Sequence, residues 1–278
     1  MGKIVWLASY PKSGNTWLRM FLLNLFTGAE APVRLNEVSA MSTGDTVLRW
    51  YREVDKRPPA AWTPKDVARL RAKVQEHLAG LAPDTIFVKT HAALLPMLDE
   101  PAFNMDVTAG AIYVVRNPLD IVPSYAKHTG LDLDATITLM STPNHMLPRT
   151  EGLTEFIQGG WSQNVASWTR EAHPAIHVVR YEDMSAAPRE TFSAACRFLN
   201  LATTPERLER AIAHAGIQVL RRLEDEEGFH ERTKSQERFF GAGQPGVWRD
   251  VLNDGQVRRL VERHRAQMSR FGYVPDGY

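Results

Sequence analysis

The sequence predicts an α/β fold in which helices flank a parallel sheet on both faces. Three observations support this prediction: short apolar segments recur along the chain, amphipathic segments lie between them, and polar residues follow each apolar segment. Apolar strands that alternate with helices are typical of parallel sheets, because such strands are buried on both sides. The expected strands are residues 4–8, 85–88, 111–115 and 176–179.

The first strand leads through a short loop into a helix. Residues 4–8 are all apolar, and Ser9-Tyr10-Pro11 ends the run. Residues 15–25 then carry apolar side chains at helical spacing. Pro118 is suited to open a second helix, because proline is favoured at the first helical position. Residues 188–200 are expected to form a third helix.

Two stretches break this alternation. Residues 28–66 hold four prolines, and we expect an irregular insertion that forms the acceptor pocket. Residues 225–250 are rich in charge and glycine, and we expect a long loop that acts as a mobile lid. No repeat or linker divides the chain, which predicts a single domain over residues 1–278. The aromatic and methionine residues that could line the pocket, or could simply be core, are Trp50, Tyr51, Trp62, Met140, Met146, Phe156 and Trp161.

Composition excludes several classes of protein. The chain has 278 residues, of which 44% are hydrophobic and 23% charged, and its formal net charge is +1. This near-neutral balance argues against nucleic acid or a membrane surface as partner. The single cysteine, Cys196, excludes a disulfide framework and is expected to be buried. No apolar stretch is long enough for a signal peptide or a membrane span, so we expect a cytoplasmic protein. We also expect no metal, because no paired acidic residues at a strand end predict a magnesium site.

The loop after the first strand has the composition of an anion site. A helix N-terminus offers unpaired N–H groups, and Gly14 lets the backbone approach an oxygen closely. Lys12 adds a full positive charge, and Ser13, Asn15 and Thr16 add further donors. The order differs from a Walker A loop, in which lysine follows the glycine.

Polar residues also follow the other three strands. Lys89 and His91 follow the second, Arg116 the third and Tyr181 the fourth. Ligands of parallel sheets bind beyond the carboxyl ends of the strands. We therefore expect these side chains to converge with Lys12 on one crevice.

Four segments resemble the motifs of sulfotransferases that use 3′-phosphoadenosine 5′-phosphosulfate (PAPS). Residues 10–17, Tyr-Pro-Lys-Ser-Gly-Asn-Thr-Trp, resemble the 5′-phosphosulfate loop of that family, and Lys89-Thr90-His91 resembles its catalytic strand end. Residues 116–120, together with Ser124, resemble the 3′-phosphate motif. Residues 180–184, Arg-Tyr-Glu-Asp-Met, resemble the adenine-side motif, and all four occur in the family's order.

The resemblance implies a P-loop-type fold and a cytosolic-type enzyme, similar to bacterial members. Such an enzyme transfers the sulfuryl group of PAPS to a hydroxyl or amine of a small acceptor and releases 3′,5′-ADP. It implies His91 as the general base, with Lys12 and Lys89 as further catalytic residues. A homodimer is left open. The residues implied to bind the donor are Lys12, Ser13, Gly14, Asn15, Thr16, Trp17, Arg116, Ser124, Tyr181, Gly241, Ala242 and Gly243.

The C-terminal part departs from the family pattern. The usual Arg-Lys-Gly corresponds here to residues 241–243, Gly-Ala-Gly, so two cationic contacts are lost. Arg238 and Lys234 are the candidate replacements. Two other readings stay open: a P-loop nucleotide kinase or NTPase that needs magnesium, and a non-catalytic nucleotide-binding module. His77, His214 and His264 are expected to be surface residues.

Overall fold

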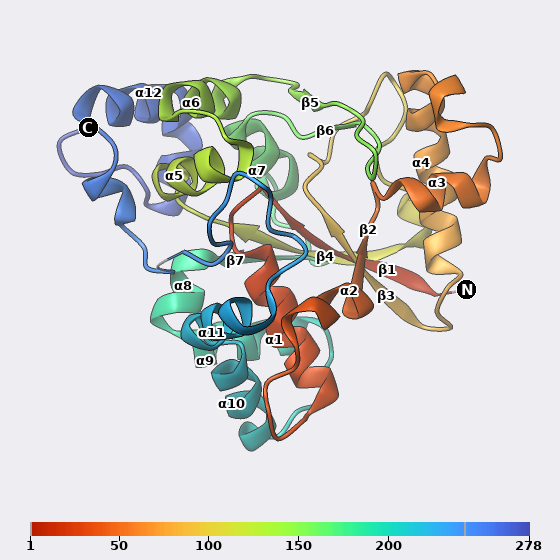
Figure 1. Ribbon diagram of the computed structural model, residues 1–278, viewed down its shortest axis with the longest axis horizontal. Coiled ribbons are helices and arrows are strands. Elements are labelled where there is room, and N and C mark those ends of the chain that lie inside the picture. Colours follow the sequence, from red (N-terminus) through yellow and green to blue (C-terminus); the bar gives the residue numbers. More distant parts are fainter. Residues whose placement is uncertain (1, 242) are drawn as a thin grey trace. The chain divides into compact units, whose positions relative to one another are not determined.

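The computed structural model describes residues 2–241 and 243–278 and has a five-stranded central sheet (Figure 1). The strand order is β2-β3-β1-β4-β7, and β3 pairs in parallel with both β1 and β2. Each predicted strand is present, so the prediction of an α/β fold built on a parallel sheet is confirmed. The strands are β1 Lys3–Ser9, β2 Ser42–Gly44, β3 Thr85–Thr90, β4 Thr108–Val115 and β7 Ile176–Arg180.

The chain divides into two compact units. The first comprises Met1–Tyr10, Ser42–Tyr113 and Thr142–Val178. The second comprises Pro11–Met41, Val114–Ser141 and Val179–Tyr278. The assignment of one domain to the whole chain stays a prediction.

In the first unit, helix α4 packs against β1 and β3 (Figure 1). Thr63 and Asp66 form a capping box at its start, and Pro64 occupies the first turn, as expected for a well-defined helix N-terminus. Helix α3 packs on α4, and a two-stranded antiparallel ladder joins β5 and β6. The remaining elements of this unit are α3 Leu48–Val54, η2 Pro59–Ala61, α4 Pro64–Ala79, η3 Met105–Val107, β5 Met146–Leu147, β6 Phe156–Ile157 and α7 Trp161–Thr169.

The second unit is helical. Helix α1 packs on α10, and α12 packs on α5 and α6. Helix α1 ends at Gly28, whose φ of 63° is left-handed and favours glycine as a C-cap. The elements are α1 Asn15–Thr27, η1 Leu35–Glu37, α2 Val38–Met41, α5 Pro118–Thr129, α6 Leu133–Ser141, α8 Tyr181–Ala186, α9 Pro188–Phe198, α10 Pro205–His214, α11 Ile217–Glu227, η4 Val247–Asp250 and α12 Asp254–Phe271.

Two predictions about irregular segments were wrong in part. Residues 28–66 contain short helices and the edge strand β2. Residues 225–227 belong to α11, so the loop begins only at Gly228. Glu224, at 3% exposure, is buried because its carboxylate accepts hydrogen bonds from the backbone N–H groups of Phe239 (2.6 Å) and Phe240 (3.0 Å). Glu224 therefore anchors the segment that holds Phe239 and Phe240, within the stretch that we expected to be a mobile lid.

Candidate active site

The loop after β1 has the backbone shape of an anion site. Lys12 has a φ of 65° and Gly14 a φ of 102°, both in the left-handed region. Gly14 is the N-cap of α1, whose first turn holds no acidic residue. A Cβ atom at Gly14 would lie 2.6 Å from Cδ2 of Tyr181, so only glycine fits there. Backbone N–H groups arranged in this way at a helix N-terminus form a concave site for anions.

Arg116 holds this loop from β4. Its Nη1 donates a hydrogen bond of 3.0 Å to the carbonyl oxygen of Lys12, and its guanidinium carbon lies 4.0 Å from the ring centre of Tyr181. The Nε of Arg116 and the hydroxyl of Ser13 are buried, and neither has a hydrogen-bond partner among the described residues. Buried donors are normally satisfied, so these two fit an anionic ligand with several oxygens.

A cavity of about 380 Å³ lies in the same unit, next to Trp17. Tyr181 packs edge-on against Trp17, with ring centres 5.4 Å apart, and donates its hydroxyl to the carbonyl of Gly243 (2.8 Å). Apolar side chains and a few polar groups line the cavity, as is usual for small-molecule sites. The cavity is lined by Trp17, Met184, Ser185, Pro188, Phe192, Ile212, Gly216, Ile217, Gln218, Arg221, Gly243 and Gln244.

Residues 229–240, which come late in the sequence, contact the loop after β1 and the start of α1. The carboxylate of Glu231 lies 3.3 Å from the hydroxyl of Thr16, which donates to it, and 2.8 Å from Nη1 of Arg19. The ring centre of Phe239 lies 3.9 Å from Nζ of Lys12. A carboxylate and an aromatic face thus contact groups that resemble the donor-binding residues of the family. Neither Glu231 nor Phe239 was identified from the sequence, because their loop carries no periodic signal.

Two carboxylates, the buried Asp120 and the half-buried Glu182, fix the segments around this site. Asp120 accepts hydrogen bonds from the N–H groups of Gly246 (2.8 Å) and Trp248 (3.1 Å). Glu182 accepts from the N–H of Asn117 (3.0 Å) and the hydroxyl of Tyr273 (2.7 Å). Burial raises the pKa of Tyr273, and the neighbouring carboxylate adds to the shift. Glu182 therefore organises the chain after β4.

In the first unit, His91 follows β3 directly and is held through its ring. Its Nδ1 lies 2.8 Å from the carbonyl oxygen of Ser9 and 3.3 Å from the Ser9 hydroxyl. A carbonyl only accepts, so Nδ1 carries the proton and the lone pair of the neutral ring is on Nε2. Lys89 is half-buried near the end of β3, beside Gly44 of β2.

An ion pair is buried next to Thr90, the residue between Lys89 and His91. Asp45 and Arg71 are both 1% exposed at their side chains and form a direct pair. Burial raises the pKa of Asp45, while Arg71 and the Thr90 hydroxyl oppose that shift. Thr90 in turn accepts the N–H of Ala92 (3.1 Å). Sequence reasoning missed this pair, because isolated charges usually indicate surface.

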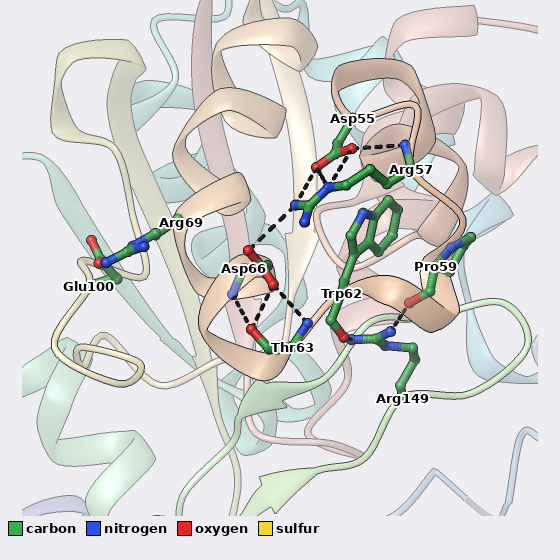
Figure 2. A network of polar contacts seen from close by, with 9 residues as sticks. All are labelled: Asp55, Arg57, Pro59, Trp62, Thr63, Asp66, Arg69, Glu100 and Arg149. Carbon is green, nitrogen blue, oxygen red and sulfur yellow. Dashed lines mark hydrogen bonds and ion pairs between the residues drawn. The ribbon is translucent and has the colours of Figure 1, made fainter.

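Figure 2 shows Arg149 reaching the backbone of the segment that precedes α4. Its guanidinium donates to the carbonyl oxygens of Pro59 and Trp62, and it pairs with Glu155 at 2.6 Å. Arg57 bridges Asp55 and Asp66 nearby, and it lowers the pKa of Asp55 to about 2 through hydrogen bonds. Residues 55–66 and 149–155 are thus tied together within the first unit.

The remaining predicted site residues have mixed outcomes. Ser124 lies half-buried on α5, and Gly241 has open space around it. Ala242 lies outside the described residues. Arg238 pairs with Asp225 at 2.5 Å. Lys12, Arg116 and Tyr181 meet in the second unit, whereas Lys89 and His91 belong to the first; convergence of all five stays a prediction.

The acceptor-pocket candidates are mostly core. The candidates Tyr51, Trp62, Met140, Phe156 and Trp161 are each at most 6% exposed, whereas Met146 is 40% exposed.

His264 is 3% exposed, so the expectation that it is a surface residue was wrong. Burial lowers the pKa of His264 to about 4. Cys196 is buried, as predicted.

Comparison with known proteins decides the family. A family model described as "Sulfotransferase domain" matches residues 3–272. The chain belongs to this sulfotransferase family. The prediction of a sulfotransferase is therefore confirmed, and the family match spans both units.

The curated relatives are distant but cover nearly the whole chain. Mouse sulfotransferase 1B1 is 26% identical over 284 residues, which cover 96% of this chain and 83% of that protein. Flavonol 3-sulfotransferase of Flaveria bidentis is 23% identical over 97% of this chain and 83% of its own length. Cytosolic sulfotransferase 13 of Arabidopsis thaliana is 26% identical over 88% of this chain and 71% of its own length.

Solved structures share the fold. Retinol dehydratase, in complex with androsterone and the inactive cofactor PAP, aligns with a TM-score of 0.64 and 18% identity, covering 95% of this chain and 80% of that one. Mouse sulfotransferase SULT7A1, complexed with PAP, aligns with a TM-score of 0.62 and 16% identity, covering 98% and 90%.

Membrane-spanning helices and metal-binding clusters are both absent from the described residues. No helix there is both long and apolar enough to span a bilayer. No group of three or more histidine, cysteine, aspartate or glutamate side chains in that part of the chain is arranged to hold a metal ion.

Proposed function

We propose that this sulfotransferase uses PAPS as donor and a small molecule with a hydroxyl or amine as acceptor. The observation that carries the proposal is the cluster around Arg116. There, a left-handed loop at a helix N-terminus and a cavity beside Trp17 lie within one unit. The same unit holds two buried donors that have no hydrogen-bond partner among residues 2–241 and 243–278. An adenosine carrying two phosphate groups needs an apolar slot together with cationic and N–H donors, and this unit offers both.

In the proposed mechanism, the acceptor oxygen attacks sulfur while the bond from sulfur to the phosphate oxygen breaks. His91 accepts the acceptor proton on Nε2, since Nδ1 donates to Ser9. Lys12 and Lys89 offset negative charge on the leaving phosphate and the transferring group. Fixed charges suit such a reaction, in which positioning and electrostatic stabilisation supply most of the catalysis.

We propose that Trp17, Phe192 and Ile217 hold the adenine. Arg116, Ser13 and the loop backbone bind phosphate oxygens. Arg221 and Gln244 line the same cavity. We propose that they contact the donor in place of the Arg-Lys pair that the family carries and this chain lacks. Arg238, a candidate from the sequence, is engaged by Asp225, which makes Arg221 the better candidate.

A donor-first experiment tests the proposal. The purified protein is titrated with 3′,5′-ADP and with ATP plus magnesium, and binding is measured by calorimetry and thermal shift. It is then incubated with ³⁵S-labelled PAPS and a panel of phenols, alcohols and amines in the presence of a chelator. We expect 3′,5′-ADP to bind and label to reach at least one acceptor.

Each alternative has its own signature. Stabilisation by ATP with magnesium and none by 3′,5′-ADP would support a P-loop kinase. Binding of 3′,5′-ADP without transfer to any acceptor would support a non-catalytic module. We also propose a cytoplasmic location, no nucleic-acid or membrane partner and, as the assembly to test by light scattering, a homodimer.

A further inference from the structure

Asn164 of α7 is buried behind the backbone of His91. It is fully buried, with 0% exposure. Its Nδ2 donates to the carbonyl oxygens of His91 (3.0 Å) and Gln158 (2.8 Å), and its Oδ1 accepts the hydroxyl of Tyr113 (2.7 Å). Both amide hydrogens are therefore used, which fixes the orientation of the amide.

Tyr113 extends this contact to the end of β1. It lies in β4 and is 0% exposed. Burial raises the pKa of its hydroxyl, and a hydrogen bond from the backbone of Tyr10 opposes the shift. The hydroxyl thus accepts from Tyr10 and donates to Asn164. A chain of hydrogen bonds runs from Tyr10, the residue before Pro11 and Lys12, to the carbonyl oxygen of His91.

The same face of α7 holds the residues that follow His91. Nε1 of Trp168 donates to the carbonyl of Ala92 (3.0 Å), and the hydroxyl of Ser167 accepts the N–H of Leu94 (2.9 Å). Asn164, Ser167 and Trp168 are spaced by three and four residues, so they share one side of the helix. Residues 91–94 are therefore held along their length.

His91 is consequently restrained at two points. Its carbonyl is held by Asn164, and its ring is held by the carbonyl of Ser9. The first restraint fixes the backbone from which the side chain extends, and the second fixes the tautomer and the ring plane. Neither Asn164 nor Tyr113 contacts the reacting atoms in this arrangement, so neither is a candidate catalytic residue.

We propose that Asn164 and Tyr113 are positioning residues, which set the orientation of His91 through its backbone carbonyl. This inference rests on the proposed function of His91 as the base. A shift of about 1 Å in a catalytic group lowers the rate by about 100-fold, so loss of this restraint is expected to be visible in kcat. Donor affinity depends on other residues and is expected to remain unchanged.

The test compares four variants. Asn164→Ala removes the amide, and Asn164→Asp keeps its shape while removing the donor to His91. Tyr113→Phe removes only the hydroxyl between Tyr10 and Asn164. Thr169→Val is the matched control, because it removes a hydroxyl of α7 that bonds to the carbonyl of Val165 in the same helix.

Two measurements follow. The first is kcat, acceptor KM and donor Kd across a pH series. The second is the ¹⁵N NMR signal of the His91 ring, assigned by its absence in His91→Gln; it needs no turnover. For both Asn164 variants we expect kcat to fall about 10- to 100-fold, while acceptor KM and donor Kd stay within about two-fold. We also expect a shift in the midpoint of the plot of kcat against pH and in the ¹⁵N signal of the His91 ring. Tyr113→Phe should change kcat, the pH midpoint and the ring signal in the same direction as the Asn164 variants, but by less.

The outcomes separate the two proposals. If the folded Asn164 variants match Thr169→Val in kcat, pH midpoint and ring signal, the positioning role is overturned. Should Asn164→Ala fail to fold, Asn164→Asp and Tyr113→Phe carry the same test. If the wild type transfers no sulfuryl group, the proposed function fails, yet the ring signal still decides whether Asn164 orients His91.

Discussion

The strand end that carries His91 and the loop that carries Lys12 differ in what their polar groups contact. Around His91, the partners are internal: Ser9 holds the ring, and Asn164 holds the carbonyl with every group of its own amide in use. In the Lys12 loop, the buried hydroxyl of Ser13 has no partner among the described residues, and Thr16 contacts the carboxylate of Glu231.

This difference is the one expected between a base that is fixed before the substrate binds, the role proposed for His91, and a loop that receives a ligand, the role proposed for the Lys12 loop. A catalytic group gains from being fixed before the substrate arrives, because the cost of orienting it is met during folding. A binding loop must keep donors available, and buried donors without partners destabilise the unliganded protein. Loss of His91 should therefore lower kcat and leave donor affinity unchanged, whereas loss of Arg116 should lower donor affinity.

Replacement of His91 tests the first half of this comparison and has the largest expected effect. His91→Ala should lower kcat by about 10²- to 10⁴-fold, the usual contribution of a positioned base. Donor Kd should stay within about two-fold, because His91 belongs to neither phosphate-binding segment. Steady-state kinetics and calorimetry on the same preparation measure both. A kcat within a few-fold of the wild type would show that another group accepts the proton.

His264 tests whether acid loss of activity arises from the base or from unfolding. Its pKa is about 4 in the folded protein, because burial disfavours the charged ring, against 6.5 when unfolded. The unfolded chain therefore binds more protons between these values. The free energy of unfolding is unaffected by the titration of His264 above about pH 6.5. It falls as the pH drops from 6.5 towards 4, by about 3 kcal/mol in all.

The matching experiment is denaturant unfolding of wild type and His264→Leu from pH 4 to 7. The variant should lack this part of the pH dependence, while His77→Gln, which changes a half-buried histidine of the first unit, should retain it. Equal slopes in wild type and His264→Leu would mean that His264 titrates normally. With this slope known, activity lost in acid can be assigned to the base or to unfolding.

Replacement of Arg116 tests the second half of the comparison. Arg116→Ala removes the hydrogen bond to the Lys12 carbonyl oxygen, together with the charge-assisted contact that we propose Arg116 makes with the donor. Donor binding should weaken by about 1.5–3 kcal/mol, or about 10- to 150-fold, with a smaller change in acceptor KM. Calorimetry with 3′,5′-ADP measures it, and Arg116→Lys, which keeps the charge without the planar fork, should recover only part. An unchanged Kd in Arg116→Ala would place the phosphate elsewhere.

The sequence predicted the strands and the donor loop because their signals are local. Residues 4–8 are an unbroken apolar run, and Gly14 marks the turn that follows. Strand β2 was missed because it is three residues long and is held only by pairing with β3. Such distant pairing leaves no local trace in the chain.

Buried polar residues were the second feature that the sequence analysis did not predict. His264 was expected to be a surface residue, yet it is buried. Glu224 is also buried, and it accepts two backbone N–H groups there. Asn164 did leave a signal: it interrupts an apolar helical stripe formed by Trp161, Val165 and Trp168. An amide on such a stripe must find partners in the core, and that reasoning would have identified it.

Glu231 offers the finest test of the comparison, because it brings a negative charge to the loop that should bind an anion. Its carboxylate contacts Thr16 and Arg19, and the Arg19 side chain is 2% exposed. Glu231→Gln keeps the shape and removes the charge, so we expect 3′,5′-ADP to bind about 3- to 10-fold more tightly. The same change should destabilise the unliganded protein, because the buried Arg19 guanidinium loses the negative charge that lies 2.8 Å from its Nη1.

Asp225→Asn is the control for this substitution. It also removes one negative charge from this stretch of the chain, but the Asp225 carboxylate pairs with Arg238. Donor affinity is measured by calorimetry and stability by denaturant unfolding at the same pH. Tighter binding with lower stability in Glu231→Gln, and neither change in Asp225→Asn, would show that Glu231 takes up part of the loop's anion-binding capacity. Weaker binding would instead show that Glu231 supports the loop, and the contrast between the two regions would then rest on Ser13 and Arg116.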